Sequence, residues 1–521
     1  MSRADTDVGR VILVGAGPGA PDLVTVRGAE ALRRADAVVY DALAASQLLD
    51  LAPPEALRID VGKRGHDPPT KSQDDTTALL LRLAAEGRTV VRLKGGDPYV
   101  FGRGGEEASA CAAAGIPFEV IPGVSSVLGA LAYAGIPLTD RRHSASFAVV
   151  TGHKDPTQVS RDTRWDLLAG AADTLVVLMG MRNLAEIAER LIAAGRPATT
   201  PAAAVMSGTL PDQRVVEAPL GELPAAVERA GLGAPSVVVV GEVVSLREAL
   251  AWYERQPLFG RSVLVTRTPD QSAELVNALA SAGARTRLVP MIDLAPPVDA
   301  APLDAALDAL ADYDAIVFTS ANAVRFTAAR AAERGVAFEV GGARVVCVGP
   351  ATARAALDAG LPVHRSPAAR FDAEGVLVEL LGEGGVAGRR FLIPRSDLAR
   401  EVLPVGLREA GARVDAVVAY RNVPADVDAA SLREALCAGE LDVLTFASPS
   451  AARRFAELLD APAREAAARC TVAAIGPVTA RTLDDVGLPA DVVARAATAA
   501  DLVAELERAL AGGAAGIAGD G

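Results

Sequence analysis

The run from Leu93 to Glu107 combines glycines with charged residues in a pattern that suits the binding of a small ligand. It contains Leu-Lys-Gly-Gly-Asp-Pro and then Phe-Gly-Arg-Gly-Gly-Glu-Glu. Glycine has no Cβ, so such a loop at the end of a strand can bring bare backbone against a ligand. The same kind of turn also occurs where nothing binds, so this loop by itself leaves both interpretations open.

A second glycine-rich loop, from Gly15 to Gly19, follows the first predicted strand. A dinucleotide-binding loop would read Gly-x-Gly-x-x-Gly, but Ala20 stands where the third glycine belongs, and Pro18 lies inside the turn. We therefore disfavour a nicotinamide dinucleotide as the ligand.

Two ionisable residues, Asp41 and Lys63, come just after predicted strands at 37–40 and 58–61. The carboxyl ends of strands in one parallel sheet face the same crevice, where an acid and a base together serve proton transfer. By position alone, Asp41 also fits the N-cap of a helix. All four lysines lie between positions 63 and 154 of an otherwise arginine-rich chain. This suggests that some of them change protonation state, which arginine does not do.

The 521-residue chain is acidic, with 52 Lys and Arg against 65 Asp and Glu and a net charge of −13. The charge argues against nucleic acid as a partner, and the length favours three or four compact units. We find no apolar run of membrane-spanning length and no secretory leader, so we expect a cytoplasmic protein without a membrane partner. The four cysteines and four histidines are too dispersed for a metal site, and we expect the cysteines to be small core residues.

The alternation of predicted strands and helices indicates an α/β fold with parallel sheets. A first lobe has predicted strands at 11–14, 37–40, 58–61, 89–93 and 118–121, and predicted helices at 74–85 and 104–114. A second lobe has predicted strands at 146–151, 174–179, 202–206 and 236–240, and predicted helices at 183–194 and 220–230. The segment 249–260 is expected to be a linker.

The second half of the chain contains an internal repeat. Three segments recur in order, with the second copies 127 or 128 residues after the first: 263–267 and 391–395, 314–320 and 442–448, 348–353 and 475–480. The repeat predicts two similar α/β lobes with a cleft between them. The Gly/Ala-rich stretch 511–521 is expected to be a flexible tail.

The first half carries further motifs in order: Tyr40-Asp41, Gly62-Lys-Arg64, Pro122-Gly123, Gly135-Ile-Pro-Leu-Thr139, Thr151-Gly-His153 and Met179-Gly180. With the two glycine-rich loops, they resemble the uroporphyrinogen-III C-methyltransferases, which are S-adenosylmethionine-dependent tetrapyrrole methylases. The resemblance covers about 10–248 and implies two lobes, at about 10–138 and 143–248. It implies two successive methyl transfers to ring carbons of uroporphyrinogen III, giving precorrin-2 without a metal.

The resemblance also implies roles for individual residues. S-adenosylmethionine would be held by Pro18, Gly95, Gly96, Asp97, Val100, Ser125, Ser126, Met179 and Gly208. Asp41 would accept a proton and Lys63 would donate one. The substrate's carboxylates would meet Arg64, Arg103 and Arg141, with Arg92 and Arg142 as further candidates. Asp140 departs from the family, which usually has a histidine there, and this puts the local substrate contacts in doubt.

The repeated half resembles uroporphyrinogen-III synthase over 261–510, through Val-Thr-Arg267, Phe318-Thr-Ser320, Pro394-Arg395, Phe446-Ala-Ser448 and Gly476-Pro-Val-Thr479. The resemblance implies lobe one at about 261–293 plus 422–510 and lobe two at about 296–420. It implies closure of hydroxymethylbilane to uroporphyrinogen III with inversion of one ring, without a cofactor. Tyr420 would be a hydrogen-bond or proton partner, and Ser320, Ser448 and Thr479 would line the cleft. Capping and turn formation also explain these hydroxyls.

Together the two resemblances imply a bifunctional enzyme of tetrapyrrole biosynthesis, in which the synthase makes what the methyltransferase consumes. The alternative is a later corrin-ring methylase with a non-catalytic, regulatory synthase-like domain. The family implies a homodimer through the methyltransferase. The sequence leaves open whether precorrin-2 goes on to sirohaem or to cobalamin.

Overall fold

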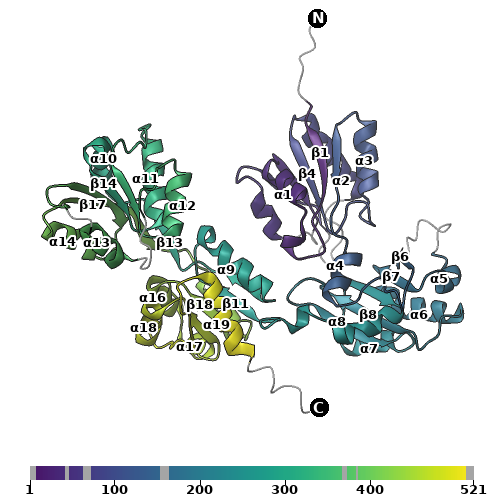
Figure 1. The fold of residues 1–521 in the computed structure, drawn as a ribbon. Coiled ribbons are helices and arrows are strands. Elements are labelled where there is room, and N and C mark those ends of the chain that lie inside the picture. The colour runs from purple at the N-terminus through teal and green to yellow at the C-terminus, as the bar shows by residue number, and fades with distance from the viewer. Residues whose placement is uncertain are drawn as a thin grey trace, which may run out of the picture. The chain divides into compact units, whose positions relative to one another are not determined.

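The computed structural model describes residues 8–41, 46–62, 72–152, 163–365, 372–382 and 385–511. They form four five-stranded sheets with helices against them (Figure 1), which confirms the predicted α/β class. By compactness the chain falls into two units. One comprises Met1–Val263, Val276–Thr286 and Val503–Gly521, and the other Leu264–Leu275 and Arg287–Leu502.

The first sheet is entirely parallel, in the order β3-β2-β4-β1-β5. Its strands are β1 (Arg10–Gly15), β2 (Ala37–Tyr40), β3 (Leu57–Asp60), β4 (Thr89–Lys94) and β5 (Phe118–Ile121), close to the predicted positions. Alternate residues of a strand point to opposite faces. Val11 and Leu13 therefore pack with α2 (Gln73–Ala85) and α3 (Gly104–Ala113). Ile12 and Val14 pack on the other face, with α1 (Val26–Arg33) and η2 (Ser46–Leu51) (Figure 1).

The second sheet is mixed, in the order β6-β7-β10-β8-β9, with β6 and β7 parallel and the remaining pairs antiparallel. Its strands are β6 (Phe147–Thr151), β7 (Thr174–Leu178), β8 (Pro201–Met206), β9 (Arg214–Pro219) and β10 (Ser236–Val240). One face is covered by α5 (Trp165–Ala171), α6 (Leu184–Ala193) and α7 (Leu223–Arg229). The other packs against α4 (Ser126–Tyr133), so the helix that leaves the first sheet is buried on the second. Our sequence analysis missed β9, an edge strand without a buried residue.

The segment 249–260, expected to be a linker, is packed. Tyr253 is only 5% exposed, and its ring contacts those of Tyr133, Trp252 and Phe259 at centroid distances of 4.8, 5.5 and 5.2 Å. Such clusters bury much apolar area, which holds this stretch against the first unit.

The other two sheets belong to the repeated half. One has the order β12-β11-β18-β19-β20 and the other β13-β17-β16-β14-β15. Their strands are β11 (Ser262–Val265), β12 (Arg285–Leu288), β13 (Ile292–Ala295), β14 (Ala315–Phe318), β15 (Arg344–Cys347), β16 (Arg390–Ser396), β17 (Arg413–Pro424), β18 (Val443–Phe446), β19 (Thr471–Ala474) and β20 (Val492–Val493). In the matched sequence segments, β11 corresponds to β16, β18 to β14 and β19 to β15. These strands stand in the same order in both sheets, as a repeat would give, although the duplication itself stays a prediction.

The helices of this half are α9 (Pro269–Ser281), α10 (Ala301–Asp308), α11 (Ala321–Glu333), α12 (Pro350–Asp358), α13 (Ala373–Gly382), α14 (Val402–Glu409), α15 (Ala429–Cys437), α16 (Pro449–Leu458), α17 (Ala461–Ala467), α18 (Pro477–Asp485) and α19 (Ala499–Ala511). Strands β13 and β17 pair antiparallel. The chain therefore enters the sheet β13-β17-β16-β14-β15 at Ile292 and leaves it at Pro424; the lobe bounds expected from the sequence, about 296–420 for lobe two, stay a prediction. The stretch 512–521 lies outside the described residues.

Among the described helices, none has the length and apolarity needed to cross a membrane. The expectation of four core cysteines was wrong for Cys437, which is exposed at the end of α15, whereas Cys111, Cys347 and Cys470 are buried. Cys437 is the last residue of α15, and the buried positions of this helix are Leu432, Ala435 and Leu436.

Candidate active sites

Three loops meet backbone to backbone beyond the carboxyl ends of β4, β1 and β5, which are adjacent strands. The Gly96 amide donates to the Gly17 carbonyl at 2.7 Å, and the Gly17 amide donates back at 3.3 Å. A Cβ on Gly123 would lie 2.2 Å from the Gly96 carbonyl oxygen and 2.7 Å from the Gly15 Cα. Only glycine fits this approach, which leaves a cradle of bare backbone at the sheet edge.

The Asp97 side chain links the loop after β4 to the loop after β5. One carboxylate oxygen accepts a hydrogen bond from the Gly123 amide at 3.0 Å, and the other accepts from the Tyr99 amide at 2.8 Å. A carboxylate has about four acceptor sites, so Asp97 keeps acceptor capacity for a ligand while it fixes the loop geometry.

The predicted cofactor residues Pro18, Ser125, Ser126 and Gly208 lie around the first turns of α4. Ser125 caps this helix, its Oγ accepting from the Val127 amide. An added Cβ on Gly96 would come within 3.8 Å of both Ser125 Cα and Ser126 N. Pro18 and Gly208 lie against the next residues of this helix. A Cβ added to Gly129 would lie 2.5 Å from Pro18 Cγ, and one added to Gly208 would lie 2.3 Å from Ala130 Cβ.

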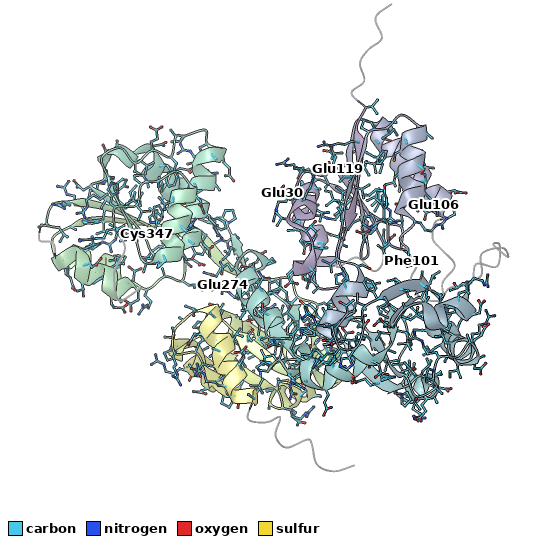
Figure 2. All side chains as sticks on the ribbon, turned by 45° about the vertical axis from the view of Figure 1, so that its right-hand side comes forward. Glu30, Phe101, Glu106, Glu119, Glu274 and Cys347 are labelled. Atoms are coloured by element: carbon cyan, nitrogen blue, oxygen red, sulfur yellow. The ribbon has the colours of Figure 1, made fainter. Side chains whose placement is uncertain are left out.

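The remaining predicted cofactor residues are partly exposed. Val100 is 39% exposed, on the same loop as Gly95, and its neighbour Phe101 is 43% exposed (labelled in Figure 2). Met179 is 51% exposed and directly follows Leu178, which shares a buried cluster with α4. Phe101 and Met179 have positive φ angles of 53° and 54°. This conformation is strained for residues with side chains, and such strain concentrates at functional sites.

A network of four charged side chains lies at the carboxyl end of β4. Arg92 and Lys94 are two residues apart, so they point to the same face of the sheet, which α3 covers with Glu107. Arg92 is 3% exposed, Glu107 is fully buried, and Asp41 is 32% exposed. Arg92 pairs with Asp41 at 2.5 Å and with Glu107 at 3.1 Å. Lys94 Nζ lies 3.2 Å from Glu107 and 3.8 Å from Asp41. Two cations therefore offset two carboxylates, and Asp41 is the member of this network most open to solvent.

The environment of Lys94 changes its acidity. Burial is the largest effect, and together with the Arg92 guanidinium it lowers the pKa of Lys94 below its ordinary value, against the opposing pull of Glu107 and Asp41. A lysine with a lowered pKa exchanges a proton more easily than a free one.

The network corrects one prediction. Arg92 cannot meet substrate carboxylates as expected, because its guanidinium is buried and donates to Asp41, Glu107 and the Val39 and Leu93 carbonyls. Our sequence analysis missed Lys94 and Glu107 as site residues. The signal for Lys94 was the scarcity of lysine in this chain.

In the repeated half, the predicted pair Tyr420 and Ser320 comes together. Their hydroxyl oxygens are 3.2 Å apart, and either can donate. Tyr420 is 7% exposed and its ring stacks on Phe326. Ser320 caps α11 and Ser448 caps α16 with the same backbone angles, φ −157° and ψ 152°. Thr479 is buried in α18. Ser320, Ser448 and Thr479 follow β14, β18 and β19, at strand ends where α/β sheets bind ligands.

Comparison with known proteins decides the family. Residues 10–224 match the family model of the tetrapyrrole (corrin/porphyrin) methylases, and residues 273–504 match that of uroporphyrinogen-III synthase HemD. The chain is 36% identical over 468 residues to the porphyrin biosynthesis protein HemD of Ruminiclostridium josui, an alignment that covers 89% of this chain and 91% of that protein. The chain belongs to the family of tetrapyrrole methylases fused to a uroporphyrinogen-III synthase domain. Both resemblances seen in the sequence are thereby confirmed.

Two further proteins match this chain over about half of its length. The siroheme synthase of Azotobacter vinelandii is 52% identical over 248 residues, which are 47% of this chain but only 53% of that enzyme. The uroporphyrin-III C-methyl transferase of Thermus thermophilus, solved in complex with S-adenyl homocysteine, is 40% identical. That match covers 46% of this chain and all of the other, with a TM-score of 0.40.

The remaining predicted residues of the methylase half differ in what surrounds them. Lys63 and Arg64 lie outside the described residues. Arg103 is exposed and pairs with Glu106 at 2.7 Å, and Arg141 is exposed. Asp140, which stands in place of the family histidine, accepts from the backbone amide and the side chain of Arg142, and these bonds lower the pKa of its carboxyl. It therefore serves as an acceptor that holds a turn, where a histidine would have offered a proton.

Proposed function

We propose that the synthase half closes hydroxymethylbilane to uroporphyrinogen III and that the methylase half methylates this product twice to give precorrin-2. The observation that carries the proposal is the fusion of both domains in one chain. The product of the synthase is the earliest macrocycle of the pathway, so a methylase joined to it is best placed to use that macrocycle. A later corrin-ring methylase gains nothing from this partner.

S-adenosylmethionine supplies the electrophilic methyl group to the methylase half. The glycine cradle fits this donor, because Gly15 and Gly123 let the loop backbones approach where a Cβ would overlap backbone atoms, so that bare backbone is presented at the sheet edge. Asp97, Pro18, Ser125, Ser126 and Gly208 orient its polar parts, while Val100 and Met179 cover its apolar parts. The chief contribution of these residues is alignment of the donor with a pyrrole carbon.

Asp41 accepts the proton that the methylated ring must lose. Arg92 fixes the carboxylate at 2.5 Å, and the partial exposure of Asp41 leaves it accessible. Lys63, which follows β3 in the sequence, returns a proton. General acid–base help of this kind is worth about 10²–10⁴-fold in rate.

The synthase half orients a flexible chain for ring closure. Loss of water from the hydroxymethyl end leaves a cation-like intermediate, and the Tyr420 hydroxyl, held by Ser320, assists as hydrogen-bond or proton partner. Ser448 and Thr479 contact the same substrate from the other lobe. Bringing the ends together is mainly a matter of orientation.

One incubation tests both halves. The full-length protein is mixed with hydroxymethylbilane, with and without S-adenosylmethionine, and the products are resolved by mass and by isomer. We expect uroporphyrinogen III without the methyl donor and a dimethylated product with it. Formation of the type I isomer alone would refute the synthase assignment. Type III isomer that stays unmethylated would favour a later methylase.

The cofactor assignment is tested separately by calorimetry. Asp97→Asn keeps the size of the side chain but removes its charge and one acceptor oxygen. Binding of S-adenosylmethionine should weaken at least tenfold, the factor that corresponds to about 1.4 kcal/mol. Unchanged affinity would remove Asp97 from the donor site.

A further inference from the structure

A cavity of ≈ 240 Å³ lies in the lobe formed by β13 to β17, apart from the residues to which a role was assigned above. It opens beside the carboxyl ends of β14, β15 and β16, and α13 and α14 contribute to its walls. Its lining includes Thr319, Val348, Asp372, Ile393, Arg395 and Leu403. One water molecule occupies about 30 Å³ in the liquid, so the cavity has room for a short carboxylate side arm.

The strand order explains why a ligand site forms here. The chain passes from β14 to its neighbour β15 and then crosses back to β16, on the other side of β14. Ligands of open α/β sheets bind beyond the strand ends where the direction of winding reverses. Thr319 follows β14 and Arg395 lies on β16, so the cavity is at this reversal point.

Arg395 has unused hydrogen-bonding capacity. Its side chain is 17% exposed, and its Nη2 donates to Glu401 at 2.5 Å. Its Nε and Nη1 are shielded from water and have no hydrogen-bond partner among the described residues. These two atoms carry three N–H donors, and burying donors unpaired costs free energy that an anion would recover.

The other charged groups of the cavity are already engaged. Arg400 makes two bonds to Glu374, at 2.7 and 3.1 Å. The Asp372 carboxylate accepts from the Gly375 amide at 2.8 Å. Glu401, the partner of Arg395, is 56% exposed, and an exposed ion pair of this kind is weak enough to be exchanged.

We propose that this cavity binds one carboxylate arm of the tetrapyrrole substrate and that Arg395 is its recognition residue, the arm taking the place of Glu401. The inference rests on the proposed synthase function. Guanidinium groups bind planar carboxylates through paired N–H donors. The cavity lies on the face of the sheet that α13 and α14 cover, whereas Tyr420 packs on the α11 face. Both lie at the carboxyl end of β16: Thr319 precedes Ser320, and Ser396, next to Arg395, is the register partner of Tyr420. A substrate that crosses this edge of the sheet reaches Tyr420 with one part and this cavity with a carboxylate arm.

Steady-state kinetics of the full-length protein tests the proposal. The rate of type III isomer formation is measured without S-adenosylmethionine, after subtraction of spontaneous closure. Arg395→Gln should raise KM for hydroxymethylbilane about 10- to 100-fold with kcat changed less, as loss of a charge-assisted hydrogen bond predicts. Arg395→Lys should not restore KM, because a point charge lacks the planar arrangement of donors. The control Arg408→Gln changes an exposed arginine of α14 that does not line the cavity and should leave KM unchanged.

If Arg395→Gln does not fold, a second variant, Glu401→Gln, tests the carboxylate site. Glu401→Gln removes the carboxylate that competes for Arg395, so KM should fall at least twofold. A KM that stays the same or rises in Glu401→Gln, or a KM within twofold of wild type in a folded Arg395→Gln, would overturn the carboxylate site while leaving the synthase function standing. A wild-type protein that forms no type III isomer would overturn the synthase function and the site together.

Discussion

The buried network around Arg92 makes a sharp prediction about stability. Glu107→Gln keeps the shape of a fully buried side chain but removes its charge. Arg92 and Lys94 would then share one carboxylate, Asp41, and one positive charge would be left uncompensated in the interior. Removing one partner of a buried ion pair typically costs about 3–5 kcal/mol, and we expect a loss of this size.

The adjacent residue provides a matched control. Glu106 lies on the same helix, α3, one position earlier (labelled in Figure 2), and its side chain is 57% exposed in its pair with Arg103. Exposed pairs contribute about 0–1 kcal/mol. Glu106→Gln should therefore leave the stability nearly unchanged, although it makes the same chemical change.

The assay is hydrogen exchange followed by mass spectrometry on peptides from β4 and α3. It reports the local opening free energy, which suits a multidomain chain that does not unfold in two states. A loss of about 3–5 kcal/mol corresponds to an opening constant about 150 to 5,000 times larger, at 1.36 kcal/mol per factor of ten. The double variant Lys94→Met/Glu107→Gln restores charge balance and should recover most of the loss. The reasoning fails if Glu107→Gln costs less than about 1 kcal/mol, or if the double variant is less stable than the single one.

The network also sets the sign of a pH effect. The folded-state pKa of Lys94 is lowered, so between that value and the ordinary lysine value the unfolded state binds more protons than the folded state. Stability then rises with pH through this window, because Lys94 loses its charge in the fold. The deficit of Glu107→Gln should be smaller at pH 9.5 than at pH 7, as measured by the same hydrogen-exchange assay against wild type at about equal ionic strength. A deficit that grew with pH would contradict the assignment of Lys94 as the charge that is released.

Three further outcomes test other parts of the structure. Gly123→Ala would place a Cβ 2.2 Å from a backbone oxygen. It should lower both melting temperature and S-adenosylmethionine affinity, whereas Gly105→Ala, with no atom within 4 Å, should change neither; equal effects would refute the cradle. A thiol reagent at pH 8 should modify Cys437 alone in the folded protein and all four cysteines after denaturation, because the other three are buried and their thiol pKa values are raised. Tyr420→Phe should slow type III isomer formation at least about tenfold without loss of folding, if the hydroxyl takes part in proton transfer; a rate within twofold of wild type would exclude that role.

Much of the fold followed from local patterns. The strands of the first sheet were predicted within one or two residues, because consecutive apolar residues mark strands buried on both faces. The glycine loops were likewise visible, since a close approach of backbones tolerates no side chain. The edge strand β9 was not predicted, because it has no buried residue and therefore no apolar run. The packing of the segment 249–260 was not predictable, because its aromatic residues contact Tyr133, more than a hundred positions earlier.

The candidate sites, too, were predictable from the sequence only in part. Asp41 and Asp97 stood out by their place after strands and within a glycine motif, but nothing local marked Glu107 as the partner of Arg92. The cavity beside Arg395 depends on strand order, because β14, β16 and α14 become neighbours only in the folded lobe.

By itself, the sequence determined the α/β class, the two fused halves and the glycine loops at the strand ends, since each depends on residues close together in the chain. The tertiary structure alone decided the ionic surroundings of these residues. Asp41 and Arg92 are 51 positions apart yet pair at 2.5 Å, and this contact turned a supposed substrate arginine into a buried support for the proposed proton acceptor. Burial and pairing depend on which distant segments fold together, and those two properties set the charge state of a side chain.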